Sequence, residues 1–264
     1  MKWATQSVSG ANLPRLDPDR LREYEIPFPP LSDQQRTAGL LEQADRLRRT
    51  RRYALELTDT FLPAAFLQLF GDPVRNTKGW PCEAVGNLGD VATGGTPRSE
   101  DAGMFGGGIP FVTPGDLEVD TLHPQRFLTE TGANATGTVR CGATLVCCIG
   151  ATIGKADKTR ARSAFNQQSN AVEWGSRIID DFGLYVMRFY SRAIAERGRS
   201  TTLPILKKSS FEEMSVPVPP LPLQQQFAVT VERVERLRSV QRESLRQSEH
   251  LFHSLLQQAF SPGA

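Results

Sequence analysis

The segment IPFPPLSDQQ, residues 26–35, recurs as VPVPPLPLQQ, residues 216–225, at a distance of 190 residues. The match extends upstream, where LPRL (residues 13–16) aligns with LPIL (residues 203–206) at the same distance. A repeat of this length indicates that one structural unit occurs twice in the chain. The sequence is therefore organised as two copies of a cassette on either side of a different central region.

Each cassette predicts a long helix that follows a proline-rich approach. Alternating prolines hold the backbone extended, because proline fixes its own φ and keeps the preceding residue out of the helical region. Ser32 is expected to cap the first helix, with Gln35 at the third helical position. Few helix-breaking residues follow in either copy, and 30 helical residues would span about 45 Å. We therefore expect helices over residues 32–72 and 222–260.

Apolar residues recur in both cassettes at steps of three and four, as in helices that pack on each other. This spacing predicts that the two helices pair as an antiparallel coiled coil. The residues predicted to line the coiled coil or to bind a partner are Leu40, Ala44, Leu47, Ala54, Phe61, Val234, Leu237, Leu251 and Leu255. Polar residues such as Arg51 and Gln241 interrupt the stripe and are expected to fix its register. An ordinary helical bundle would explain the stripe equally well, but not its repetition around the central region.

The central region, residues 76–215, has a different composition. It contains short apolar runs, such as ATLVCCIG and IPFVTPGDL, separated by glycine-rich turn signals such as GGTP and FGGG. This pattern predicts short strands joined by long loops, with one helix near the end of the region in DDFGLYVMRFYSRAIAERG. The predicted fold class is α+β: a strand-rich α+β domain flanked by two long helices. Residues 1–31 and 216–221 contain the proline-rich linkers.

The composition is that of an ordinary globular chain, with 39% hydrophobic and 23% charged residues. No apolar run approaches the roughly 20 residues that span a bilayer, and the first residues do not resemble a signal peptide. We therefore expect a cytoplasmic protein with no membrane contact. The net charge of +2 is too small to indicate nucleic-acid binding by itself.

No arrangement of residues predicts catalysis. The glycine-rich loops have neither the lysine of a P-loop nor the spacing of a dinucleotide motif. The two Pro-Pro pairs, in FPPL and VPPL, differ from the Asn- or Asp-Pro-Pro-aromatic loop of a DNA methyltransferase. Cys82, Cys141, Cys147 and Cys148 have no zinc spacing and are expected to be buried reduced thiols, with Cys147 and Cys148 on opposite faces of a strand. We expect no catalytic residue, no metal and no cofactor in this chain.

Polar and basic residues in the predicted loops favour contact with DNA. Arginine reads guanine, asparagine and glutamine read adenine, and lysine and hydroxyl groups hold phosphates. The candidate DNA-binding residues are Thr93, Gly94, Gly95, Thr96, Arg98, Lys155, Lys158, Arg160, Asn166, Gln167, Gln168, Lys207 and Lys208. Solvent-exposed loops collect such residues in any protein, so each position alone is a weak indication. The basic run RLRRTRR, residues 46–52, could touch phosphate or form a solvated helix face.

The repeated cassette, together with LGDVATGGTP, IPFVTPGDL, IGATIGKA and FNQQSNA in this order, resembles the specificity subunit of type I restriction–modification systems. The resemblance implies that residues 76–215 are a target-recognition domain and that the two helices are conserved regions. It implies a non-catalytic, DNA-binding subunit of a phage-defence complex. The partners it implies are double-stranded DNA and an adenine methyltransferase subunit that carries the methyl donor, with or without a restriction and translocation subunit.

This sequence departs from that family in having one recognition domain, whereas the family pattern has two. Residues 1–25 resemble only the tail of another such domain, so we expect a half-length form. Two copies could restore the full arrangement as a homodimer with two-fold symmetry, which would read an inverted, interrupted target. The sequence alone leaves three alternatives open: a degenerate fragment, a coiled-coil adaptor whose central domain binds protein, and an enzyme that uses the glycine-rich loops.

Overall fold

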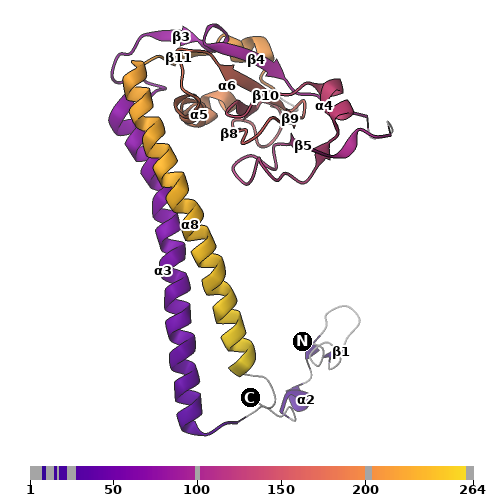
Figure 1. Cartoon of the computed structure of the whole chain (residues 1–264), viewed down its shortest axis with the longest axis vertical. Helices are drawn as coiled ribbons and strands as arrows, with labels where there is room; N and C mark the ends of the chain where they lie inside the picture. Colours follow the sequence, from indigo (N-terminus) through magenta and orange to yellow (C-terminus); the bar gives the residue numbers. More distant parts are fainter. Residues whose placement is uncertain are drawn as a thin grey trace. The chain divides into compact units, whose positions relative to one another are not determined.

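The computed structural model describes residues 8–9, 15–16, 18–22, 28–98, 102–199 and 204–259. Two long helices, α3 (Leu31–Phe70) and α8 (Leu221–Ala259), flank an α+β domain in the sequence (Figure 1). The short elements before α3 are β1 (Val8–Ser9), β2 (Arg15–Leu16) and α2 (Pro18–Arg22). These elements confirm the predicted fold class, and both long helices begin one residue earlier than predicted.

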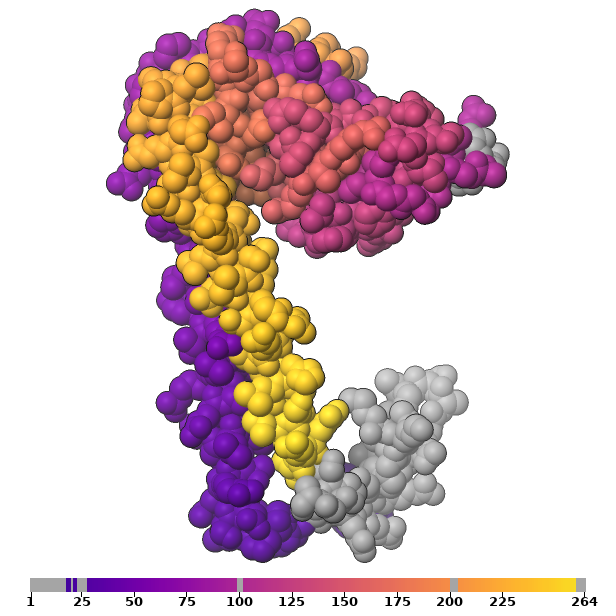
Figure 2. All heavy atoms as spheres, in the orientation of Figure 1, coloured from indigo at the N-terminus to yellow at the C-terminus, as the bar shows by residue number. Residues whose placement is uncertain are grey.

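The chain divides into two compact units, and each contains part of the helix pair. One unit is Leu57–Arg238, and the other consists of the described parts of residues 1–56 and 239–264. In the second unit Arg51 donates to the Ser248 hydroxyl at 2.7 Å, and the Arg48 guanidinium lies over the Phe252 ring. In the first unit Asp59 pairs with Arg238. The partner residues on α8 have lower numbers as the residue number on α3 rises, so the two helices are antiparallel, as predicted (Figures 1 and 2).

The buried or half-buried positions of both helices follow the same heptad stripe in the two copies of the cassette. On α3 they include Leu41, Ala44, Arg48, Arg51, Leu55, Thr58 and Leu62. On α8 they include the seven equivalent residues, Val231, Val234, Arg238, Gln241, Leu245, Ser248 and Phe252. We call these residues the seam. Because arginine, glutamine, threonine and serine occupy its middle, the seam is more polar than an ordinary coiled-coil core.

Five residues predicted for the coiled coil lie outside the seam, with large exposed fractions: Leu40 45%, Leu47 40%, Phe61 51%, Leu237 50% and Leu251 46%. Ala44 is buried, and Ala54, Val234 and Leu255 are half-buried. The prediction combined seam positions, such as Ala44 and Val234, with residues that lie one position before a seam residue. We call the exposed members of this second set the outer stripe: Leu40, Leu47 and Phe61 on α3, and Leu237 and Leu251 on α8.

Each long helix starts with the same hydrogen bond. The Gln34 side-chain amide donates to the Pro29 carbonyl at 2.8 Å, and the equivalent Gln224 amide donates to the Pro219 carbonyl, also at 2.8 Å. Because α3 starts at Leu31, Ser32 lies inside the first turn and is not the N-cap that the sequence suggested. The glutamine, and not the serine, distinguishes the start of both helices.

The central domain is built on two small sheets. The first has the order β4-β10-β7-β8 and is fully antiparallel. Its strands are β4 (Gly89–Thr93), β7 (Thr144–Cys147), β8 (Ala156–Lys158) and β10 (Ser169–Trp174). The second sheet has the order β6-β5-β9, from β5 (Phe105–Val112), β6 (Phe127–Leu128) and β9 (Ala164–Phe165). A third pairing joins β3 (Cys82–Ala84) to β11 (Ser215–Pro217).

Helices cover these sheets where the sequence predicted only one. The predicted helix near the end of the domain is divided at Tyr190 into α5 (Asp180–Phe189) and α6 (Ser191–Arg197). Short helices α4 (Glu130–Thr136) and α7 (Lys208–Glu212) and the turn η1 (Val85–Asn87) complete the domain. These short segments contain glycines and polar residues, so the sequence pattern does not predict that they are helical.

The ends of the two long helices that belong to the Leu57–Arg238 unit form one core with α5. Phe66 is fully buried, and its ring lies 4.8 Å from Phe70, 5.5 Å from Phe182 and 5.3 Å from Phe227. The domain is therefore held on α3 and α8 by shared aromatic packing, and not by the linkers alone.

The thiols provide a test of this packing. Cys147 and Cys148 are buried on opposite sides of β7, in two different clusters, as predicted, but Cys82 and Cys141 are exposed. Burial also raises the pKa of the Cys148 thiol to about 12. We expect Cys82 and Cys141 to react quickly with a thiol reagent at neutral pH and the buried pair only after denaturation. Rapid labelling of all four thiols in the native protein would contradict the structure.

Candidate DNA interface

Three loops meet at one end of the four-stranded sheet. Thr93, the last residue of β4, pairs with Asn170, and Cys147, the last residue of β7, pairs with Ser169. The loop after β4, the loop after β7 and the loop before β10 are therefore neighbours. Seven of the predicted DNA-binding residues lie at the end of β4 or in the first and third of these loops, and we call them the loop cluster: Thr93, Gly94, Gly95, Thr96, Asn166, Gln167 and Gln168.

Hydrogen bonds hold the loop cluster in one arrangement. The Gly94 and Gly95 amides donate to the carbonyls of Ser169 and Phe165 at 3.2 and 3.0 Å. The Thr96 hydroxyl donates to the Gln167 side-chain oxygen, and the buried Asn166 amide donates to Gln168 at 2.9 Å. Gln167 itself is exposed. The cluster therefore presents a fixed amide and hydroxyl surface, which is the chemistry that recognises base edges and phosphates.

The predicted cations are placed less uniformly. Lys155 lies at the same end of the sheet, where its carbonyl accepts from Cys147, and its ammonium group is 3.8 Å from Glu118. Lys158 pairs with Asp181 beside α8, away from the loop cluster, and Lys208 pairs with Glu212. Arg98, Arg160 and Lys207 are exposed and have no ion pair among the described residues. The structure thus brings part of the predicted set together and uses the rest in internal ion pairs.

The basic run of α3 also has a structural role. Arg48 and Arg51 belong to the seam, where they contact Phe252 and Ser248. Arg52 pairs with Glu249 on α8 at 3.0 Å. This segment is therefore largely engaged in helix pairing and is not an open phosphate-binding face.

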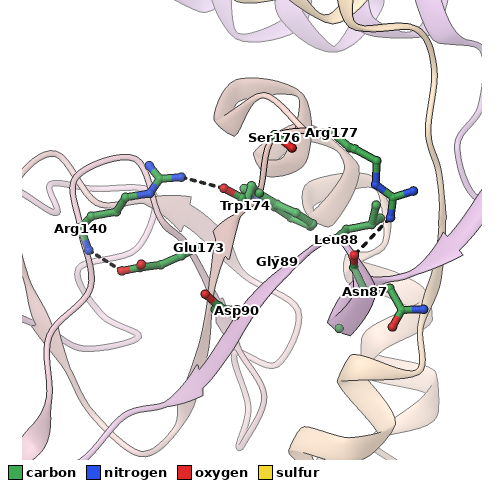
Figure 3. A pocket seen from close by; sticks show the side chains of 11 residues that line it. Asn87, Leu88, Gly89, Asp90, Arg140, Glu173, Trp174, Ser176 and Arg177 are labelled. Atoms are coloured by element: carbon green, nitrogen blue, oxygen red, sulfur yellow. Dashed lines mark hydrogen bonds between the residues drawn. The ribbon is translucent and has the colours of Figure 1, made fainter.

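A polar cleft of about 370 Å³ lies at the opposite end of β4 and β10 (Figure 3). Arg140 donates to Asp180 at 2.7 Å and to the Trp174 carbonyl at 3.2 Å, and the hydrogen bonds with Asp180 raise the pKa of Arg140. On the other side Arg177 pairs with Glu83, which lowers the pKa of that carboxyl group. Both guanidinium groups are neutralised by carboxylates. The ion pairs therefore link segments of the domain, and the cleft is not an anion site.

Within the residues that the structure describes, no group of three or more His, Cys, Asp or Glu side chains could hold a metal ion. Of the helices in that part of the chain, none is long and apolar enough to cross a membrane. The loops of the domain, which hydrogen bonds hold in place, present amides, hydroxyls and a few cations that can bind a ligand. The repeated helices flank this domain in the sequence. This combination defines a recognition module.

The chain matches a known protein-family model. Residues 1–57 and 78–247 match the type I restriction modification DNA specificity domain, and the chain belongs to that family. Membership in a family of specificity subunits supports the prediction of a non-catalytic role.

Curated relatives agree with this assignment. The chain is 20% identical over 253 residues to the putative type I restriction enzyme MjaX specificity subunit of Methanocaldococcus jannaschii, covering 90% of this chain and 59% of that protein. It is 28% identical over 157 residues to the type I restriction enzyme HindI specificity subunit of Haemophilus influenzae, covering 54% of this chain and 32% of the relative. The chain thus spans little more than half the length of the first of these relatives.

Solved structures share the fold. An S subunit of a type I restriction–modification system from M. genitalium aligns with a TM-score of 0.67 at 17% identity, covering all of this chain and 70% of that one. The HsdS subunit of Thermoanaerobacter tengcongensis aligns with a TM-score of 0.55 at 19% identity, covering all of this chain and 68% of its own. These likenesses concern the fold.

Proposed function

We propose that this chain binds DNA in a sequence-specific manner and directs an adenine methyltransferase to a split target. The observation that carries the proposal is the loop cluster, a fixed amide and hydroxyl surface in a chain of the DNA specificity family. In this proposal Gln167 and Thr96 contact bases or phosphates, and the exposed Arg98 and Lys207 add positive charge.

The proposal is tested by selection from a pool of random DNA duplexes, with the chain alone and in complex with its modification subunit. The selected duplexes should share one sequence, and affinity for that sequence should fall steeply with salt concentration because phosphate contacts release counterions. A pool that remains random, with the protein folded, would favour the adaptor interpretation.

The outer stripe is the proposed docking surface for the methyltransferase. Leu47 and Phe61 on α3 occupy the same repeat positions as Leu237 and Leu251 on α8, and all four are at least 40% exposed. Apolar residues at heptad spacing on an open helix face suit an amphipathic partner helix. Because these positions recur in both cassettes, each helix offers equivalent exposed apolar residues to the partner.

The double substitution Leu47→Ser and Leu237→Ser is expected to weaken binding of the modification subunit by at least about tenfold, since two apolar contacts are lost. Thermal unfolding of the free chain should be nearly unchanged because both side chains are exposed. The dissociation constant can be measured by titration of the labelled partner. As a control, Leu41→Ser in the seam should lower the melting temperature, and unaltered partner affinity of the double variant would refute this docking surface.

The first cassette suggests where a second recognition half binds. In the second cassette the buried Gln224 amide donates to the Arg177 carbonyl at 3.0 Å and accepts from the Ile179 amide at 2.8 Å. Gln34 repeats the start of that arrangement, but among the described residues none donates to its amide oxygen. A groove of about 550 Å³ lies beside it, lined by residues that include Leu40, Leu41 and Leu255. We propose that a second copy of the chain binds here, so that a homodimer reads two inverted half-sites.

A further inference from the structure

The guanidinium group of Arg126 stacks on an aromatic ring, whereas several other arginines of this domain pair with carboxylates. Its guanidinium carbon lies 3.8 Å from the centre of the Phe105 ring and 5.9 Å from that of Phe111. The side chain is exposed, and it forms no ion pair with any residue that the structure describes. By contrast, Arg140, Arg162, Arg177 and Arg188 of the same domain each pair with a carboxylate. Arg126 is thus fixed without being neutralised.

Stacking on a ring restricts the guanidinium group to a plane above that ring. The N–H donors project from the edge of this plane as a fork, which matches two acceptors side by side. In DNA the O6 and N7 atoms of guanine present such a pair in the major groove. The stack therefore leaves free the edge of Arg126 that a guanine requires.

The strand that carries Phe105 has a bare edge next to this arginine. Gly106, Gly107 and Gly108 are all exposed. The fold explains two of them: Gly106 has a φ of 88°, and a Cβ at Gly107 would lie 2.3 Å from the Leu128 carbonyl oxygen. Gly108 has no positive φ, and a Cβ there would meet nothing within 4 Å. It lies where the pairing of β5 with β6 shifts register between Phe105 and Ile109, and glycine at this position leaves the exposed strand free of a side chain.

This edge belongs to the three-stranded sheet, and one loop of the loop cluster follows directly after its strand β9. The Arg126 carbonyl accepts from Phe111 on β5, and β5 pairs in parallel with β9 at Phe111 and Val112. The Asn166 amide then donates to the Val112 carbonyl, so the loop cluster continues directly from β9. Figure 1 places β5 and α4 on the side of the domain away from the start of α8.

We propose that Arg126, stacked on Phe105, reads a guanine in the major groove, and that the open edge at Gly108 admits the DNA at that point. The inference rests on the proposed function and adds a base contact to it. It names a specificity-determining residue outside the loop cluster.

The test uses the complex of the chain with its modification subunit and the duplex that selection yields. Arg126→Ala should weaken binding to that duplex by roughly 5- to 150-fold and relax the preference for guanine at one position. Arg126→Lys should keep the dependence on salt but weaken the same preference, because an ammonium group has no planar fork. Replacing that guanine with 7-deazaguanine should weaken binding of the unmodified protein and leave the Arg126→Ala variant unaffected.

Gly108→Val provides an independent arm. It should leave the melting temperature nearly unchanged and weaken DNA binding by at least about tenfold, since a side chain would occupy the approach. If Arg126→Ala instead weakens all sequences equally and lowers the salt slope by about one, the residue contacts phosphate and the base-reading inference is wrong. Wild-type affinity of Gly108→Val would also overturn it. A wild-type complex without sequence preference would refute the proposed function itself, which is a distinguishable result.

Discussion

Phe66→Ala is expected to lower the free energy of unfolding of the Leu57–Arg238 unit by about 3–5 kcal/mol, the range for removing a buried phenylalanine side chain. Phe66 is fully buried among aromatic rings of α3, α5 and α8, with ring centres 4.8–6.1 Å away. Removal of the Phe66 ring leaves a cavity. The surrounding rings cannot fill it by a joint movement, because they belong to three different helices. The same substitution should loosen the attachment of the domain to its helices.

Chemical denaturation followed by tryptophan fluorescence measures this loss. Phe61→Ala is the matched control, because Phe61 lies on the same helix but is 51% exposed. Its effect should remain within about 0.5 kcal/mol, as for ordinary surface substitutions. Equal effects of the two variants would mean that Phe66 is not in the shared core.

Gly94→Ala is expected to disrupt the loop cluster itself. A Cβ at this position would lie 2.3 Å from the Asn166 carbonyl oxygen and 2.4 Å from that of Phe165. Both are backbone atoms, so the two loops must move apart, at a cost of about 1–3 kcal/mol in stability. Because the displaced loop carries Gln167, we expect sequence-specific DNA affinity to fall by at least about tenfold even where the protein remains folded.

Gly95→Ala separates crowding from the mere loss of a glycine. A Cβ at Gly95 would meet Thr136 at 3.5 Å, which is ordinary van der Waals contact. This variant should bind DNA nearly as well as the unmodified protein, as measured by fluorescence anisotropy with folding checked by circular dichroism. If Gly94→Ala bound as tightly as Gly95→Ala, the loop cluster would not be the DNA interface.

The repeat allowed the helices to be predicted but not the face on which they pair. Two proline-started cassettes at a fixed distance predict two long antiparallel helices, and both are present. The predicted stripe contained seam positions, among them Ala44 and Arg51, but it also contained exposed residues such as Leu47, because Leu47 is more apolar than the neighbouring Arg48, which lines the seam. Hydrophobicity alone favours the outer stripe, whereas the interior arginines are accommodated by contacts with Ser248 and Phe252 that only the folded pair reveals.

The candidate site was predictable to a similar extent. Residue types in GGTP and FNQQ suggested contact chemistry, and strand pairing brings these two loops together although Thr96 and Gln167 are 71 residues apart in the sequence. The sequence could not show that Lys158 is engaged by Asp181, or that Arg126 is stacked and unpaired. Whether a cation is free depends on which carboxylates the fold places beside it, and neighbours in the sequence do not determine this.

The most direct test of the central claim is a map of methyladenine across the genome of a host that lacks adenine methylation. The host would express this chain together with its modification subunit, and a parallel culture would express the modification subunit alone. We expect methylation at one interrupted, inverted-repeat sequence that is absent without this chain. An interrupted asymmetric sequence would keep the specificity role but contradict the homodimer. No methylation, with both proteins folded and bound to each other, would contradict the account.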